Sequence, residues 1–304
     1  MQVSRAGYHA WATRPPSARS QADAALKERI VALHAASRAT YGAPRIHAML
    51  AREGQRVGRK RVARLMAEAG IEGVSRRRGR ARTTTPDAHR APAPDRVGRR
   101  FAAAGPDRLW LADITYLPTH EGWLFLGVVA DMWSRRIVGW SMREDLRAEL
   151  VVDAISMAVA RRRPDPGLVH HSDRGSQYSS LAFGRTLADS GILASMGRRG
   201  DAYDNAACES VISTIKVELV RGRSFPTRDA ARLAVFDYIE TFYNPYRLHS
   251  ALGCLSPVEF EAANWPSPGP VEMTHPADAW TAVPAAHITT GPTTDLTMGE
   301  SLST

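Results

Sequence analysis

The sequence predicts an α/β protein with a layered core, preceded by a small helical unit. From residue 108, three β-rich runs follow one another with short turns between them, and helical and strand-like segments then alternate to about residue 220. Before residue 75, apolar residues recur at helical spacing, and an arginine-rich stretch comes next. Runs with a period of two predict strands and runs with a period of 3.6 predict helices, so both units follow from patterning alone.

The predicted helical unit spans residues 1–74. One helix is expected over residues 22–37, and two shorter ones end near Gly54 and Gly70 with about four residues between them, a spacing typical of a helix-turn-helix. Apolar positions on one side of the last helix leave four basic residues largely outward, namely Arg59, Lys60, Arg61 and Arg64. This helix is a candidate for DNA contact, and a three-helix bundle with a solvated basic face is the alternative.

Basic charge is concentrated in one part of the chain. The net charge is +9, and the stretch from Arg52 to Arg100 holds 15 Lys and Arg against 5 Asp and Glu, so the rest is close to neutral. Such a cluster favours a polyanion partner, usually nucleic acid; a basic linker without a specific partner is the alternative. Residues 75–104 are predicted to be this linker, with three candidates for DNA contact, Arg76, Arg77 and Arg78.

Composition limits the cellular setting. No apolar run approaches the length of a membrane span, the first residues lack the apolar centre of a secretory signal, and only two cysteines occur. We therefore expect a cytoplasmic protein without a membrane partner, disulfide framework or structural zinc site.

The predicted core spans residues 105–262, and residues 263–304 are expected to be a disordered tail because they are rich in Pro, Thr and Ala and show no periodicity. Strands are expected at residues 108–118, 122–133, 135–142, 167–173 and 192–197. Helices are expected at residues 147–163, 180–191, 200–219 and 227–244.

Three carboxylates stand out in this core. Asp113 lies in an apolar strand, Asp173 ends a short buried strand, and Glu209 lies on a helix whose apolar stripe contains Cys208, Ile212, Ile215 and Leu219. Converging carboxylates repel one another unless a cation neutralises them, and ligand sets made only of oxygen favour Mg²⁺ or Mn²⁺ over Zn²⁺. Two such ions can activate an attacking oxygen and stabilise the leaving oxygen of a phosphodiester.

Several longer stretches resemble a known family. They are "VSRAGYHAW", "YGAPRIHAML", "WLADITY", "DMWSRRIVGW", "HSDRGSQY", "YDNAACES" and "YNPYRLHSALG". In this respect the chain resembles the second-reading-frame products of insertion-sequence-three transposases, of the retroviral-integrase-like D,D,E superfamily. The 35 residues between Asp173 and Glu209, and a basic Lys216 seven residues after Glu209, agree with that family's spacing.

The resemblance implies an RNase H-like fold, a five-stranded mixed sheet with helices on both sides. It implies that Asp113, Asp173 and Glu209 hold two Mg²⁺ or Mn²⁺ ions. Lys216 would contact DNA near the scissile phosphate, and the opening of this site would be lined by Arg174, Gln177 and Tyr178. The implied chemistry is hydrolysis at the 3′ ends of the element followed by attack of the freed 3′ hydroxyl on target DNA, without a covalent enzyme intermediate.

The resemblance also implies partners: DNA at the element ends and at the target, further copies of this chain in a synaptic complex, and the upstream-frame product as a fusion or helper. A bacterial chain of this kind would be nucleoid-associated when bound to DNA. Two alternatives remain open. One is an inactive DNA-binding remnant or inhibitor of transposition, and the other is an RNase H-like nuclease without strand transfer.

Other polar residues of the motifs have competing interpretations. Asp131 is interpreted as a hydrogen-bonding structural residue rather than a fourth acid. His170 and His171 precede Asp173, and packing is favoured over metal ligation. Arg247 and His249 either contact DNA or brace the helix that carries Glu209.

Overall fold

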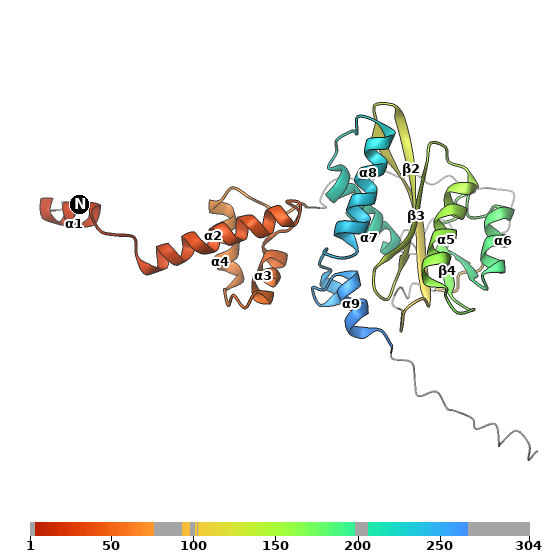
Figure 1. Ribbon diagram of the computed structural model, residues 1–304, viewed down its shortest axis with the longest axis horizontal. Helices are drawn as coiled ribbons and strands as arrows, with labels where there is room; N and C mark the ends of the chain where they lie inside the picture. Colours follow the sequence, from red (N-terminus) through yellow and green to blue (C-terminus); the bar gives the residue numbers. More distant parts are fainter. Residues whose placement is uncertain (1–3, 76–92, 98–100, 102, 198–205, 267–304) are drawn as a thin grey trace, which may run out of the picture. The chain divides into compact units, whose positions relative to one another are not determined.

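The computed structural model describes residues 4–75, 93–97, 101, 103–197 and 206–266, with the side chains of 206–209 excepted. Its centre is a five-stranded sheet in the order β3-β2-β1-β4-β5 (Figure 1). The first three strands form an antiparallel meander, and β4 and β5 run parallel to β1. The strands are β1 Leu109–Thr119, β2 Gly122–Asp131, β3 Ile137–Arg143, β4 Val169–Ser172 and β5 Leu193–Met196. The predicted mixed sheet is confirmed.

Helices cover both faces of this sheet (Figure 1). On one face lie α5 Ala148–Arg162 and α6 Leu181–Asp189. On the other lie α7 Ala206–Ile215 and α8 Arg228–Asp237, each continued by a π-helical turn, Lys216–Val220 and Tyr238–Tyr243. The alternation of β1 explains the two faces: Trp110 and Ala112 join the core with α5 and α6, whereas Leu117 joins the core with α7 and α8.

Close approach of α5 to the sheet requires a glycine in β3. A Cβ atom placed on Gly139 would lie 2.2 Å from the carbonyl oxygen of Ala154 and 2.8 Å from the Cβ of Ala158. Any side chain at this position would therefore push α5 away from the sheet. A Cβ atom placed on Gly127 of β2 would lie only 3.4 Å from the carbonyl oxygen of Leu150, near the start of the same helix.

The N-terminal helices form a small bundle around an apolar core. They are α2 Ala18–Ala36, α3 Ala43–Arg52 and α4 Arg59–Glu68; the preceding helix, α1 Arg5–Ala12, has no buried residue and gives none to this core. The helix expected from residue 22 begins earlier, because the Ser17 side chain caps it by accepting a hydrogen bond from the Ser20 NH at 3.2 Å. The shared core consists of Ile30, Leu33, Ile46, Leu50, Val62, Leu65 and Met66.

The core ends in a short 3₁₀ turn, Ser250–Leu252, and α9 Pro257–Asn264. A capping box begins α9: the Ser256 hydroxyl accepts from the Glu259 NH, and the Glu259 carboxylate accepts from the Ser256 NH. This helix continues two residues past the predicted core boundary, and the rest of the predicted tail lies outside the described residues. None of the helices in the described ranges combines the length and apolar character of a membrane span.

Candidate active site

The pairing of β1 with β4 places two of the predicted acids at one level of the sheet. The parallel pairs end at Leu111 opposite His171; Asp113 lies two residues further along β1, and Asp173 lies two residues further along the chain, directly after the end of β4. Each carboxylate is oriented by a backbone NH: Asp113 Oδ1 accepts from Ile114 at 2.8 Å, and Asp173 Oδ1 accepts from Gly175 at 2.9 Å. Two carboxylates with fixed orientations, one on β1 and one directly after β4, are therefore available as oxygen ligands.

The loop after Asp173 is held by its neighbours. Arg174 Nε donates to the Gly197 carbonyl at 2.7 Å, and Gln177 Nε2 donates to the Leu146 carbonyl at 3.0 Å. These bonds fix the loop against β5 and against the segment before α5. Tyr178 differs from expectation: it is 4% exposed and packs edge-on against Phe183, so its ring joins α6 to the sheet rather than lining an open mouth.

Helix α7 carries the third acid across the sheet. Its apolar stripe is confirmed where it is described, since Ile212, Ile215 and Leu219 are buried in the core that includes Leu117 of β1. The side chains of Cys208 and Glu209 lie outside the described ones. Among the described side chains, no three His, Cys, Asp or Glu residues form a cluster able to hold a metal ion. Two oriented carboxylates nevertheless fit a hard divalent cation, which prefers oxygen ligands.

Lys216 opens the π-helical turn after α7 and extends toward β1. Its ammonium lies 4.5 Å from the centroid of the Tyr116 ring, three residues beyond Asp113. Burial lowers the pKa of Lys216, and the negative charge of Asp113 acts in the opposite direction. The basic residue predicted for the site is thus near the first acid in space.

A buried ion pair anchors the C-terminal end of the same helix. Arg247 donates from Nε to Glu218 at 2.8 Å and from a terminal nitrogen at 2.6 Å, and the Tyr238 hydroxyl donates to Glu218 at 2.8 Å. The side chains of Arg247 and Glu218 are 2% and 7% exposed. Burial acts to raise the pKa of Glu218, yet the hydrogen bonds and charge of Arg247 lower it. Arg247 therefore braces the helix that carries Glu209 and Lys216, which is the second of its two proposed roles.

Sequence reasoning did not find Glu218. On an ideal α-helix it lies well to the side of the stripe formed by Ile212, Ile215 and Leu219. The π-helical turn alters that phase, and Arg45 of α3 also approaches Glu218, at 3.5 Å. The sequence holds no periodic signal for such a turn, although an arginine among aromatic residues in "FYNPYRLH" is a sign of a buried charge partner.

The remaining polar residues of the motifs have structural contacts. His249 contacts Arg247 at 3.3 Å and packs edge-on against Tyr243. His171 Nδ1 lies 2.9 Å from the Ser195 hydroxyl, and His170 packs edge-on against Phe183. Packing, which we favour for both histidines next to Asp173, agrees with these contacts.

Asp131 has the hydrogen-bonding role predicted for it. Its carboxylate is fully buried and accepts from the NH groups of Asp107, Trp133 and Ser134 at 2.7, 2.7 and 3.0 Å. Burial raises its pKa, and these NH hydrogen bonds act to lower it. The antiparallel register places Asp113 opposite Val128 and Asp131 opposite Trp110, so the two carboxylates lie at different levels of the sheet.

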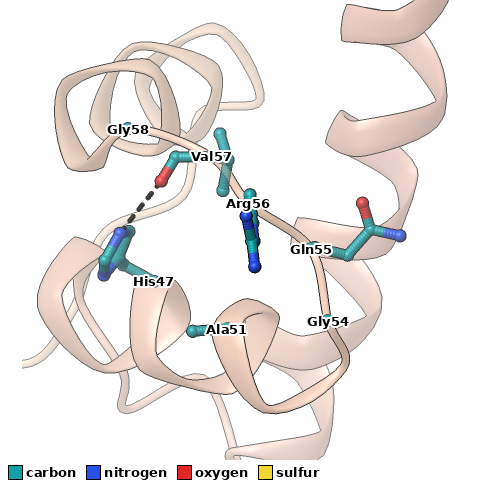
Figure 2. A pocket seen from close by; sticks show the side chains of 7 residues that line it. All are labelled: His47, Ala51, Gly54, Gln55, Arg56, Val57 and Gly58. Carbon is teal, nitrogen blue, oxygen red and sulfur yellow. Dashed lines mark hydrogen bonds between the residues drawn. The ribbon is translucent and has the colours of Figure 1, made fainter.

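In the helical unit the four predicted DNA-contact residues divide into two pairs. Arg61 and Arg64 bind Asp23 of α2, at 2.5 and 2.6 Å, so they hold α4 against its neighbour. Arg59 and Lys60 are exposed at the start of α4. Figure 2 shows the preceding turn, where His47 of α3 bonds the Val57 carbonyl at 2.9 Å. Arg76, Arg77 and Arg78 lie outside the described residues.

Fold and site together define a class of protein. Residues 103–202 and 209–264 match two families described as integrase core domain, and residues 21–79 match an HTH-like domain. The chain is thus an integrase-core protein with an HTH-like domain.

Its relatives identify the family. The chain is 42% identical to the "Insertion element IS600 uncharacterized 31 kDa protein" of Shigella sonnei, over 85% of this chain and 94% of that protein. It is 38% identical to "Transposase InsF for insertion sequence IS3A" of Escherichia coli K12, over 87% of this chain and 92% of that protein. The chain belongs to the IS3-family transposases, which are DDE-type polynucleotidyl transferases, as the motif resemblance predicts.

Among solved structures, the chain is similar to a simian T-cell lymphotropic virus intasome in complex with the PP2A regulatory subunit B56 gamma. The similarity covers 80% of this chain and 79% of that chain, with 13% sequence identity and a TM-score of 0.46.

Replacing Arg247 with alanine should destabilise the fold strongly, because it leaves the Glu218 charge buried without its partner. We expect the free energy of unfolding in urea to fall by about 3–5 kcal/mol. As a matched control, Arg143→Ala removes an exposed pair with Asp153 and should cost about 1 kcal/mol or less. Equal losses in the two variants would contradict a bracing role.

Buried His170 should make stability sensitive to acid. Burial lowers its pKa from 6.5 to about 3, so between these values the unfolded chain binds a proton that the folded chain excludes. Stability is therefore lost as pH falls, by up to about 1.4 kcal/mol per pH unit. Denaturation of wild type and His170→Gln at pH 7, 6 and 5 measures this effect: the difference between them should change most below pH 6.5. A difference that is constant with pH would refute it.

Proposed function

We propose that this chain cuts DNA at the 3′ ends of its insertion element and joins the freed ends to target DNA by direct attack on a phosphodiester. The observation that carries the proposal is the position of Asp113 and Asp173 at one level of the sheet, with Lys216 near Asp113. Carboxylates bind cations and an ammonium binds phosphate, so this arrangement suits a charged DNA strand approaching two acids.

In the proposed site, Asp113, Asp173 and Glu209 hold Mg²⁺ or Mn²⁺, in a pair of ions. When bound, such ions supply an activated oxygen nucleophile and stabilise the leaving oxygen. The protein's own part is orientation: backbone NH groups fix Asp113 and Asp173, and the Glu218–Arg247 pair fixes the helix that carries Glu209. Lys216 binds a phosphate oxygen of the strand being cut.

The proposed partners are DNA and other protein chains. Arg59 and Lys60, exposed at the start of α4, contact phosphates, which position a protein on DNA without reading its sequence. Because one short helix offers few base contacts, recognition of the element ends requires further copies of this chain and the product of the upstream reading frame, as a fusion or helper.

Amide variants of the acids test the chemistry. Asp113→Asn, Asp173→Asn and Glu209→Gln should fold and bind DNA, yet nick element-end DNA at least about a hundredfold more slowly in Mg²⁺, because each loses a charged ligand. The readout is gel analysis of 3′-end nicking and of strand joining. An Asp153→Asn variant, exposed on α5, is the control and should cut normally. Wild-type rates in any acid variant would refute the assignment, and nicking without joining would favour a nuclease.

Footprinting tests the partner proposal. At physiological salt the chain alone should protect element ends only slightly better than random DNA, and its affinity should fall steeply as salt rises, since phosphate contacts release counterions. Adding the upstream-frame product should give an end-specific footprint. A sharp footprint from this chain alone would show that the helper is unnecessary for recognition.

A further inference from the structure

Trp123 on the β1–β2 hairpin has no part in the site described so far, although it pairs with Tyr116, the ring that Lys216 contacts. Tyr116 of β1 and Trp123 of β2 meet edge to face, with ring centroids 4.8 Å apart. Trp123 is 52% exposed, although it is the largest kind of apolar side chain. A tryptophan that only stabilised the fold would be expected to bury more of its ring.

The pair lies on a part of the hairpin that α5 does not reach. The register sets Trp123 opposite Pro118 and Tyr116 opposite Phe125, so the two rings project on the same face. Leu117 and Leu124 project on the other face and are fully buried beneath α7 and α8. Helix α5 contacts β2 at Gly127, four residues further from the hairpin tip than Trp123.

A cation connects the pair to the acids. The Lys216 ammonium lies 4.5 Å from the Tyr116 ring centroid, so one ring contacts both the charge and Trp123. The same ammonium interacts with the charge of Asp113. Within the described residues, β1 pairs with β4 only over Leu109–Leu111, and the edge of β1 beyond that point is where Lys216 reaches Tyr116. Asp113 projects on the face of Leu117 and the two rings project on the other face, so Lys216, which reaches the edge of β1, is the group that interacts with both the acid and the aromatic pair.

We propose that Trp123, supported by Tyr116, is a stacking platform for an unpaired base of the DNA end, while Lys216 holds the phosphate of a neighbouring nucleotide. The proposal rests on the proposed function, because it requires a DNA strand at Asp113. Every base has a flat aromatic face, so a tryptophan binds any base, and a neighbouring cation binds the backbone. Strand separation at the cut end is what this platform would stabilise.

Binding of full-length protein to two DNA probes, measured by fluorescence anisotropy in EDTA, tests the platform. One probe is a blunt duplex, and the other is the same duplex with a short unpaired 3′ end. Trp123→Ala should bind the unpaired end about tenfold more weakly and the blunt duplex normally, and Trp123→Phe should retain most of the affinity. Leu233→Ala, a control at an exposed apolar position of α8, should match wild type on both probes.

A base-free probe keeps the test valid if Trp123→Ala does not fold. Removing the unpaired bases but keeping their phosphates should weaken DNA binding by the wild type by the same factor of about ten. The same change to the probe should not weaken binding by Trp123→Ala any further. Lys216→Ala should lose affinity for probes with and without those bases, because its contact is with phosphate.

Equal affinity of wild type for the probes with and without unpaired bases would overturn the platform. So would a Trp123→Ala variant that folds and binds the unpaired end normally. Because EDTA removes divalent ions, these results do not depend on catalysis. Failure of the platform therefore leaves normal nicking by wild type, whereas failure of the proposed function removes nicking whatever Trp123 does.

Discussion

The short parallel pairing between β1 and β4 is the constraint on which the candidate site depends. It ends at Leu111 and His171, so Asp113 of β1 and Asp173, directly after β4, lie at one level two residues beyond the last pair. A longer pairing would place a ladder of hydrogen bonds along the edge of β1 that Lys216 now reaches. The same three-residue register thus positions both aspartates and leaves the adjoining edge accessible to a third charged group.

Helix α7, which carries Glu209, is held in place by contacts at its C-terminal end rather than by contacts at the site itself. Glu218 and Arg247 bury opposite charges with two direct hydrogen bonds and a third from Tyr238, a geometry in which desolvation is compensated only while all partners are present. Both π-helical turns occur here, Lys216–Val220 and Tyr238–Tyr243. The buried cluster of Glu218, Arg247 and Tyr238 therefore sets the orientation of α7 and leaves this helix little freedom to move.

Much of the fold was predictable from the sequence. β-Rich and short buried runs between turns located all five strands to within a few residues, and Val62, Leu65 and Met66, apolar at helical spacing, lie in the core of the helical unit as expected. The five-stranded mixed sheet with helices on both sides was expected only from the resemblance, and the order of its strands was not predicted, because no local pattern shows which strands pair. The three acids stood out as carboxylates in an apolar strand, at a strand end and on a patterned helix, whereas Glu218 was missed because a widened helical turn changes which face a residue occupies.

The residues assigned to DNA by charge alone stay predictions, and the local sequence does not show which of them also bind other side chains. Arg61 and Arg64 have the same side chain as Arg59, but Asp23 of α2 binds both of them, and a contact 38 or more residues distant has no signature in the local sequence. Tyr178 is a similar case: its position after Asp173 suggested an open mouth, yet the ring fills the space between α6 and β4. Tertiary packing decides such cases.

The close packing at Gly139 bears on how genomic copies of such an insertion element lose activity by mutation. The backbone of α5 passes so close to β3 that even a methyl group at this position would overlap Ala154. Every missense change of this codon therefore acts on folding, with the acids, the basic helix and the reading frame intact. A genomic copy silenced in this way would keep Asp113, Asp173, Glu209 and Lys216, and a single change within the "DMWSRRIVGW" stretch would distinguish it from an active element.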